Sequence, residues 1–114
     1  GLGVVYKRQG LGLIPGQVVR FTEGKIPQIG WNEVHGLKTP LFEGIAEGTR
    51  FYFVHSYRAD CADEFACAKT EYYIDYPSAI WRGNVFGVQF HPEKSGDAGL
   101  KLLKNFCNYS RKKF

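Results

Sequence analysis

The stretch from Asn84 to Ser95 constrains the fold of this chain more than any other. Its first half is a short apolar run, bounded by turn residues, made up of Val85, Phe86, Val88 and Phe90. Such a run predicts a strand that is covered on both faces and that ends on His91. Pro92 fixes its own φ and disfavours helical geometry at the residue before it, so His91 to Glu93 is expected to be extended.

The types and spacing of His91 and Glu93 indicate a proton-transfer pair. In an extended segment the side chains of residues i and i+2 lie on the same side. The Glu93 carboxylate could then accept a hydrogen bond from one ring nitrogen of His91 while the other nitrogen faces outward. A histidine held in this way can take a proton from a thiol or hydroxyl and return it to a leaving amine. The alternative, common for an isolated His-x-Glu, is that His91 satisfies a strand end and Glu93 opens a helix.

Length and composition indicate one small domain. The chain has 114 residues, of which 44% are hydrophobic and 16% aromatic, enough for a core. No apolar run approaches the roughly 18 residues of a membrane span, and no secretory signal is present, so no membrane partner is expected. The formal charge of +4 arises partly at the basic C-terminal end. Because no basic patch is interleaved with aromatic residues, nucleic-acid binding is not expected either.

The cysteines predict neither disulfides nor a metal site. Cys61, Cys67 and Cys107 are odd in number and lack Cys-x-x-Cys spacing, which fits a reducing, cytoplasmic location. Acidic neighbours should raise the pKa of the Cys61 thiol, Cys67 falls on an expected strand, and Cys107 is expected on the inner face of the last helix. All three are interpreted as structural. No metal or organic cofactor is expected.

The pattern of apolar and turn residues predicts a strand-rich middle followed by a closing helix. Strands are expected at residues 17–21, 28–34, 50–59, 66–73, 78–82 and 85–90, with a short turn or one helical turn at 40–47. The glycine-rich residues 1–16 are expected to form a connecting loop. The 50–59 strand is the longest and should lie centrally in a sheet. Residues 75–77 should separate two strands, and residues 78–90 should form a hairpin.

A helix is expected over about residues 96–110. Ser95 is a good N-cap, and Asp97 falls in the first turn. Apolar residues recur at helical spacing in Ala98, Leu102, Leu103, Phe106 and Cys107. From the residues alone the chain is therefore α+β.

Four stretches occur in an order and spacing that resemble a known family. They are Gly10-Leu-Gly-Leu-Ile-Pro-Gly16, Ile29-Gly-Trp-Asn32, Phe51-Tyr-Phe-Val-His-Ser-Tyr57 and Phe90-His-Pro-Glu-Lys-Ser95. His-Pro-Glu resembles the strand-end motif of class I glutamine amidotransferases. The other stretches are similar to those of the glutaminase subunits of imidazole glycerol phosphate synthase, the HisH family. The amidotransferases of anthranilate and guanine nucleotide synthesis are the close alternatives.

The resemblance implies a fold and an activity. The fold would be a doubly wound, flavodoxin-like α/β domain, of which residues 1–114 supply the C-terminal, strand-rich half with mixed or antiparallel strands. His91 and Glu93 would be two members of a Cys-His-Glu triad that hydrolyses glutamine and delivers ammonia. The receiving partner would be a (β/α)8-barrel cyclase of histidine biosynthesis.

The resemblance also implies roles for residues outside the His-Pro-Glu motif. Ser56 and Tyr57 match a turn whose backbone groups hold the bound glutamine. Trp31, Tyr52 and Lys94 match residues presented to the cyclase, the alternative being two core aromatics and a solvated charge. His55 is expected to be a hydrogen-bonded strand-end residue rather than a second base.

The nucleophile that this chemistry needs has no counterpart in the sequence. In the family the thiolate lies on a Gly-x-Cys-x-Gly turn, and none of the three cysteines has such neighbours. We therefore expect a C-terminal portion of the domain that is inactive alone. A half sheet should also leave a long unpaired edge and favour self-association. The alternative is a non-catalytic module that docks on the cyclase.

Overall fold

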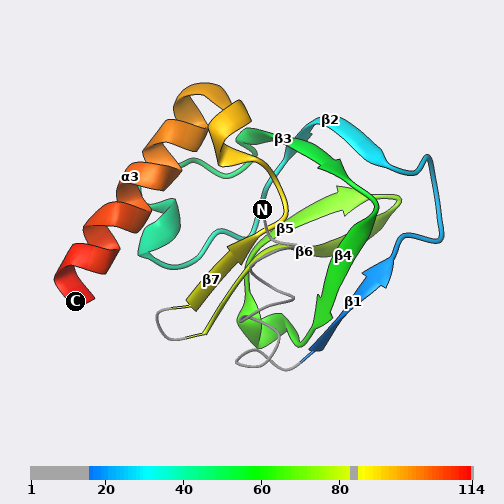
Figure 1. The fold of residues 1–114 in the computed structure, drawn as a ribbon, viewed down its shortest axis with the longest axis horizontal. Coiled ribbons are helices and arrows are strands. Elements are labelled where there is room, and N and C mark those ends of the chain that lie inside the picture. The colour runs from blue at the N-terminus through cyan, green and yellow to red at the C-terminus, as the bar shows by residue number, and fades with distance from the viewer. Residues whose placement is uncertain (1–15, 83–84, 114) are drawn as a thin grey trace.

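The computed structural model describes residues 16–82 and 85–113. Its regular elements are β1 (Gly16–Arg20), β2 (Gln28–Glu33), η2 (Pro40–Phe42), β3 (Arg50–His55), β4 (Tyr57–Cys61), η3 (Asp63–Phe65), β5 (Ala66–Tyr72), β6 (Ile74–Arg82), β7 (Val85–Val88), η4 (Pro92–Lys94) and α3 (Gly96–Lys113), where η marks a 3-10 turn. Helix α3 lies at one side of the molecule beside η2, and the strands make up the rest (Figure 1). The expected loop before Gly16 lies outside the described residues.

The described strands form three small antiparallel sheets rather than one half sheet with a long edge. Their orders are β1-β4, β2-β3 and β5-β6-β7. The expected single strand over 50–59 was wrong, because the chain bends at Ser56 and changes partner. Before the bend Tyr52 lies opposite Trp31 of β2, and after it Tyr57 lies opposite Arg20 of β1. The carbonyl of Ser56 accepts a hydrogen bond of 3.0 Å from the Phe21 N–H at the corner.

Strand β6 runs through the segment that was expected to separate two strands. Pro77 lies inside β6, opposite Lys69 of β5. Proline lacks an N–H, so it is tolerated where a strand needs no donor on that side. The pairing of β6 with β7 begins only at Ala79, which leaves the far side of Pro77 outside that ladder. The prediction that residues 75–77 break the strand was therefore wrong.

The hairpin expected over residues 78–90 is confirmed, although its strand β7 is less buried than expected. Ala79 pairs with Val88 and Arg82 with Val85, and residues 83–84 between the strands lie outside the described residues. Because β7 is the last strand of its sheet, Val85, Phe86 and Val88 are only half-buried. Full burial is reached beyond the strand, at Phe90.

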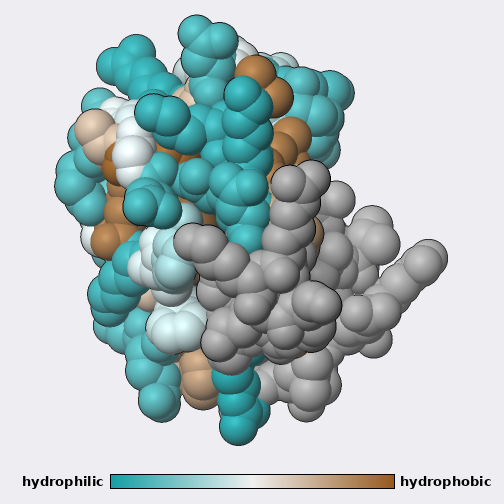
Figure 2. All heavy atoms as spheres, turned by 90° about the vertical axis from the view of Figure 1, so that its left-hand side faces the viewer, coloured by the Kyte–Doolittle hydropathy of each residue, from teal (hydrophilic) through white to brown (hydrophobic). Residues whose placement is uncertain are grey.

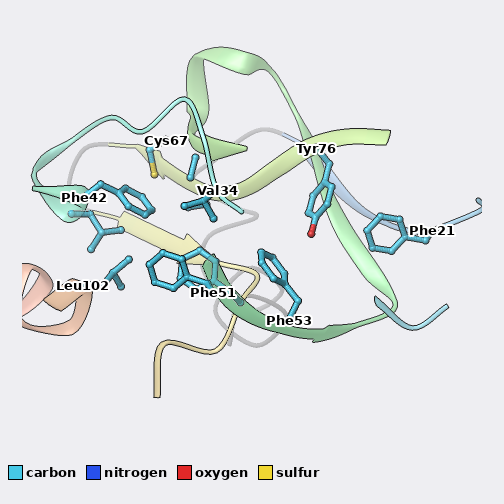
Figure 3. Close-up of a cluster of buried hydrophobic side chains, with 12 residues drawn as sticks. Phe21, Val34, Phe42, Phe51, Phe53, Cys67, Tyr76 and Leu102 are labelled. Carbon is cyan, nitrogen blue, oxygen red and sulfur yellow. The ribbon is translucent and has the colours of Figure 1, made fainter. Parts of the chain in front are cut away.

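Alternation along β3 builds the centre of the core. Phe51 and Phe53 point inward and are 0% exposed, whereas Tyr52 and Val54 point outward. The rings of Phe51 and Phe53 meet that of Phe90, with centroids 4.3 Å and 5.7 Å apart respectively. Figure 3 shows Phe51 and Phe53 beside Val34, within the largest buried cluster. Replacing such a buried phenylalanine by alanine typically costs about 3–5 kcal/mol.

Helix α3 packs through one narrow face. Leu102 is 3% exposed, and the Asn105 side chain donates to the carbonyls of Leu41 at 3.0 Å and Glu43 at 2.8 Å. The expectation that Cys107 lies on the inner face was wrong, because Cys107 is exposed. Leu103 and Phe106, which shared its apolar pattern, are each 41% exposed. Successive helix residues turn by about 100°, so Leu103 and Cys107 are rotated away from Leu102. Phe106, four residues after Leu102, lies nearer the packed face, and its ring meets that of Phe86 edge-on at 6.3 Å.

The side of the molecule that carries α3 is mixed in character. Figure 2 shows hydrophobic patches there among a mostly hydrophilic surface. Over the described residues, no helix has the length and apolar character required to span a membrane.

Candidate active site

The candidate site is built on the turn that follows β7. Strand β7 ends at Val88, three residues before the expected end at His91. Pro92–Lys94 forms a 3-10 turn instead of the expected extended segment, closed by the N–H groups of Lys94 and Ser95 on the carbonyls of His91 and Pro92, each at 3.0 Å. Proline fits the first position of a helical turn, because that position needs no N–H and its fixed φ suits the turn. The extended prediction is confirmed for His91, with φ −103° and ψ 97°, and was wrong for Pro92 and Glu93 for this reason.

The turn nevertheless brings the expected pair together. His91 Nδ1 lies 2.8 Å from Glu93 Oε1, and the two side chains are 30% and 58% exposed. A carboxylate can only accept, so Nδ1 carries the hydrogen and the neutral ring keeps a free lone pair on Nε2. This is the tautomer that a general base requires.

Electrostatics keep the Glu93 carboxylate ionised. Burial alone would raise its pKa, but hydrogen bonds from its own backbone N–H and from His91 outweigh burial and lower the pKa of Glu93. Because the charged form is favoured, the pair is present at neutral pH. Protonation of Glu93 in acid would remove the negative charge that strengthens its hydrogen bond with Nδ1–H.

Strand β3 fixes the place of the turn in the fold. The His91 N–H donates to the Tyr52 carbonyl at 2.9 Å. The ring of Phe90, the residue before His91, packs against the rings of Phe51 and Phe53. Ser95 lies just before α3, as expected of an N-cap, and its carbonyl accepts from the Gly99 N–H at 3.3 Å. Its hydroxyl, however, bonds to Tyr52 and His91.

A glycine lets α3 approach the turn closely. A Cβ on Gly99 would lie 1.9 Å from the Pro92 carbonyl oxygen, which no side chain can occupy without moving the backbone. The first turn of α3 therefore rests directly on the His-Pro-Glu turn, and Gly99 is the residue that permits it.

His55 has the supporting role that was expected. Its Nδ1 lies 2.7 Å from the Tyr57 carbonyl, and its Nε2 lies 2.8 Å from Gln28 Oε1 and 3.1 Å from the Tyr76 hydroxyl. Burial lowers the pKa of His55 to about 4, with the backbone hydrogen bond opposing this shift and repulsion from His91 adding to it. Both ring nitrogens are engaged, so His55 is not free to act as a base.

Ser56 and Tyr57, the predicted glutamine-binding residues, lie at the corner between β3 and β4. Tyr57 is 48% exposed. The ring of Phe53 contacts both His55, immediately before this corner, and Phe90, immediately before His91, with centroids 5.6 Å and 5.7 Å apart. The corner and the His-Pro-Glu turn therefore belong to one region of the molecule. The substrate role of Ser56 and Tyr57 stays a prediction.

The predicted partner-contacting aromatics lie on the outside of the β2–β3 ribbon. Trp31 is 52% exposed, and its ring lies edge-on to that of Tyr52 at 5.8 Å. Two exposed neighbours on the same face were missed by sequence reasoning, Ile29 at 60% and Val54 at 39%, which lie opposite each other. The alternation of residues 28–33 could have revealed Ile29, two residues before Trp31. Ile29, Trp31, Tyr52 and Val54 are called the outer ladder below.

Lys94, the third predicted partner contact, is also exposed, in the turn directly after Glu93. The alternative that Trp31 is an ordinary core aromatic does not hold. Whether any of these residues contacts a partner stays a prediction.

The cysteines are poorly suited to be the nucleophile. Burial and the nearby Asp60 and Asp63 raise the pKa of Cys61, as expected, and burial raises the pKa of Cys67 to about 12. Cys107 is exposed on α3. Among the described residues, no group of three or more His, Cys, Asp or Glu side chains could hold a metal ion.

Comparison with known proteins places these features in one family. Residues 2–109 match the family model described as "Glutamine amidotransferase class-I". The chain is 48% identical over 99 residues to "Imidazole glycerol phosphate synthase subunit HisH" of Bacillus cereus (strain B4264), covering 85% of the chain and 47% of that protein. It is 49% identical over 109 residues to the protein of the same name from Archaeoglobus fulgidus, covering 93% of the chain and 54% of that protein.

The chain thus spans about half the length of the curated relatives it matches. Among solved structures, one chain of PurLQS from Thermotoga maritima superposes with a TM-score of 0.71 at 22% identity, covering 87% of the chain and 55% of that structure. At this identity the match speaks for the fold alone. The expected fold class, the strand-rich part of a class I amidotransferase domain with a closing helix, is confirmed.

Proposed function

This chain belongs to the class I glutamine amidotransferase family, and from that premise we propose that it supplies the acid–base and partner-docking part of a HisH-type glutaminase. The whole enzyme would release ammonia from glutamine for a cyclase of histidine biosynthesis. The observation that carries the proposal is the His91–Glu93 pair, with Nδ1 and Oε1 2.8 Å apart. The identity of about half to the HisH subunits of two distant organisms supports the pathway.

In the proposed reaction His91 moves the protons. Nε2 accepts the proton of a cysteine thiol, and the resulting thiolate attacks the carboxamide carbon of glutamine. The imidazolium then protonates the departing amide nitrogen, so ammonia leaves and a thioester remains. Nε2 next takes a proton from water, whose oxygen attacks the thioester carbon. The thiolate leaves and recovers its proton, which releases glutamate and restores the starting state.

Glu93 acts on the imidazole alone. Its carboxylate holds the Nδ1–H tautomer in the resting state and stabilises the imidazolium that forms during each proton transfer. Because hydrogen bonds lower the pKa of Glu93, it stays charged throughout the neutral range.

The thiol would come from a part of the amidotransferase domain that does not match this chain. None of the three cysteines lies on a Gly-x-Cys-x-Gly turn. Burial raises the pKa of Cys61 and Cys67, which disfavours a thiolate. The described residues should therefore show no glutaminase activity by themselves. Ser56 and Tyr57 would hold glutamine near His91 from the corner of β3 and β4.

The outer ladder and Lys94 would face a (β/α)8-barrel cyclase. Large aromatic side chains such as Trp31 concentrate binding energy when they fill a partner's pocket. An alternative is a module that docks on the cyclase without chemistry, favoured by the lack of a nucleophile turn. Both versions use the same face and differ only in whether His91 acts as a base.

Complementation separates these versions. The chain is mixed with the part of the Archaeoglobus fulgidus HisH subunit that it does not match, together with that organism's cyclase, and ammonia release from glutamine is measured. Release above the level of each component alone is expected. Cyclase binding without ammonia would establish the docking module. Failure of both, with folded components, would overturn the proposed function.

A further inference from the structure

Ser95 is a buried polar residue for which the proposed reaction has no role. It is 2% exposed, and its hydroxyl makes two hydrogen bonds. The Tyr52 N–H donates to Oγ at 3.0 Å, and Oγ donates to the His91 carbonyl at 2.6 Å. A serine that only capped α3 would direct its oxygen to N–H groups of that helix. Both partners of Ser95 lie outside α3.

The two hydrogen bonds belong to a closed set that includes Tyr52. The His91 N–H donates to the Tyr52 carbonyl at 2.9 Å, so both backbone polar groups of Tyr52 are satisfied by the segment from His91 to Ser95. The Tyr52 side chain meanwhile stands on the outer ladder against Trp31. The side chain of Tyr52 thus forms part of the outer ladder, and its backbone is bonded to His91 and Ser95.

We propose that Ser95 is a positioning residue for His91. Its hydroxyl joins the Tyr52 N–H to the His91 carbonyl and thereby fixes the backbone of the histidine on β3. With that backbone fixed, the imidazole stays within reach of Glu93 and keeps Nε2 as the acceptor. Ser95 touches neither substrate nor the reacting atoms and acts only through His91. The inference rests on the proposed function in taking Nε2 as the base.

Removing the hydroxyl would loosen the histidine in a defined way. In a Ser95→Ala variant the buried Tyr52 N–H loses its acceptor, and the His91 carbonyl keeps only the Lys94 N–H of its own turn. The turn could then move relative to β3. A His91 ring that leaves Glu93 returns to the mixture of neutral tautomers found in free imidazole, in which the Nε2–H form predominates.

The chain offers a matched control in Ser78. It is also fully buried, and its hydroxyl accepts from Thr70 Oγ1 at 2.8 Å. Ser78→Ala therefore removes one buried hydroxyl from the fold without touching the bonds of His91 to Tyr52 and Ser95. Ser95→Cys is the conservative variant, because a thiol keeps the shape of serine and forms weaker hydrogen bonds.

The test is the tautomer of His91, read by long-range 1H–15N NMR of the histidine rings in the labelled chain near neutral pH. The wild type and Ser78→Ala should show His91 with Nδ1 protonated. Ser95→Ala should show a clear gain of the Nε2–H form, and Ser95→Cys an intermediate amount. A Ser95→Ala protein with the wild-type tautomer would overturn the proposal and leave Ser95 a purely structural residue. Should Ser95→Ala not fold, Ser95→Cys decides the matter by the same criterion.

This measurement needs no glutaminase activity, so its result stands apart from the complementation experiment. In a complemented enzyme, Ser95→Ala should lower kcat by about tenfold or more with KM nearly unchanged, whereas Ser78→Ala should alter neither. A change confined to KM would contradict a positioning role. A wild-type His91 with Nδ1 protonated, combined with no ammonia release in the complemented enzyme, would overturn the proposed function. It would leave the geometry of the His91–Glu93 pair unchallenged.

Discussion

The described part of the chain contains two histidine–carboxylate pairs, and they differ in what surrounds them. His91 and Glu93 lie 2.8 Å apart within one turn, and His35 and Asp75 lie 3.1 Å apart across two distant segments. The two histidine side chains are 30% and 47% exposed. By residue type and distance alone, either pair could be a base with its orienting acid.

The second pair is committed to holding the fold. Asp75 also binds Lys69 at 3.4 Å, and Lys69 binds Asp63 at 3.3 Å. The backbones of His35 and Lys69 exchange two further hydrogen bonds, of 2.9 Å and 2.8 Å. These contacts fasten the segment after β2 to β5, and the Asp75 carboxylate is shared between His35 and Lys69.

The ring of His35 also faces the wrong surroundings for glutamine. It lines a polar hollow of about 440 Å³ with Asn32, Glu33 and Glu71. Two carboxylates there would repel the substrate's own carboxylate. Glu93, by contrast, forms its ion pair among the described residues with His91, and Phe53 links the His-Pro-Glu turn to the β3–β4 corner by contacting the rings of both Phe90 and His55. The difference indicates that the proposed acid–base pair is distinguished by a carboxylate that is not shared with a lysine as well as by distance.

The largest expected effect separates the two histidines directly. In a complemented enzyme His91→Gln should lower kcat by on the order of 10³-fold, because no other described histidine can take over proton transfer. His35→Gln should leave kcat within about twofold. Initial rates of ammonia release measure both. Equal losses of kcat in the two variants would contradict the different roles assigned to His91 and His35.

The carboxylates should differ in the same sense by a smaller amount. Glu93→Gln keeps an oxygen that can accept from Nδ1–H and removes the charge that stabilises the imidazolium. We expect kcat to fall by about 10- to 100-fold, and Asp75→Asn to leave it unchanged. Asp75→Asn should instead lower the denaturation midpoint slightly. A Glu93→Gln enzyme with full activity would show that the charge is dispensable.

The third histidine sharpens the comparison because it has no carboxylate partner. The pKa of His55 is lowered from 6.5 to about 4, so the unfolded chain takes up a proton first as the pH falls. Stability should therefore drop between about pH 6.5 and pH 4, by on the order of 2 kcal/mol. Urea unfolding at pH 7 and pH 4.5 measures this, and His55→Gln should lose less over the same interval. An equal loss in both proteins would assign the effect to other groups.

Local sequence predicted the pairing of His91 with Glu93 better than it predicted the backbone that carries them. His91 and Glu93 are separated by one residue, and this spacing allowed their pairing to be predicted. The same spacing did not decide between an extended segment and a tight turn. The choice between those conformations depends on Phe90 and on the bonds to Tyr52, which come from distant strands. Contacts between distant strands cannot be read from the apolar pattern of one segment.

The errors in the strands and the helix have the same origin. No turn residue such as glycine or proline marks Ser56 in the sequence of residues 50–59. The corner there is set by which strand, β1 or β2, lies alongside. Pro77 is a strand breaker only where its missing N–H is needed. In α3 the apolar residues cover more than one face, so spacing alone could not show that Leu102 is buried and Cys107 exposed.

The close approach at Gly99 has a practical consequence for recognising such sites in genomes. The triplet His-Pro-Glu arises often by chance, whereas a hydroxyl four residues after the histidine and a residue without a side chain four further on are independent demands of this geometry. The combined pattern His-Pro-Glu-x-Ser-x-x-x-Gly is therefore a stricter filter than the triplet. Any larger residue at its last position would push the first turn of α3 away from the His-Pro-Glu turn and would displace His91.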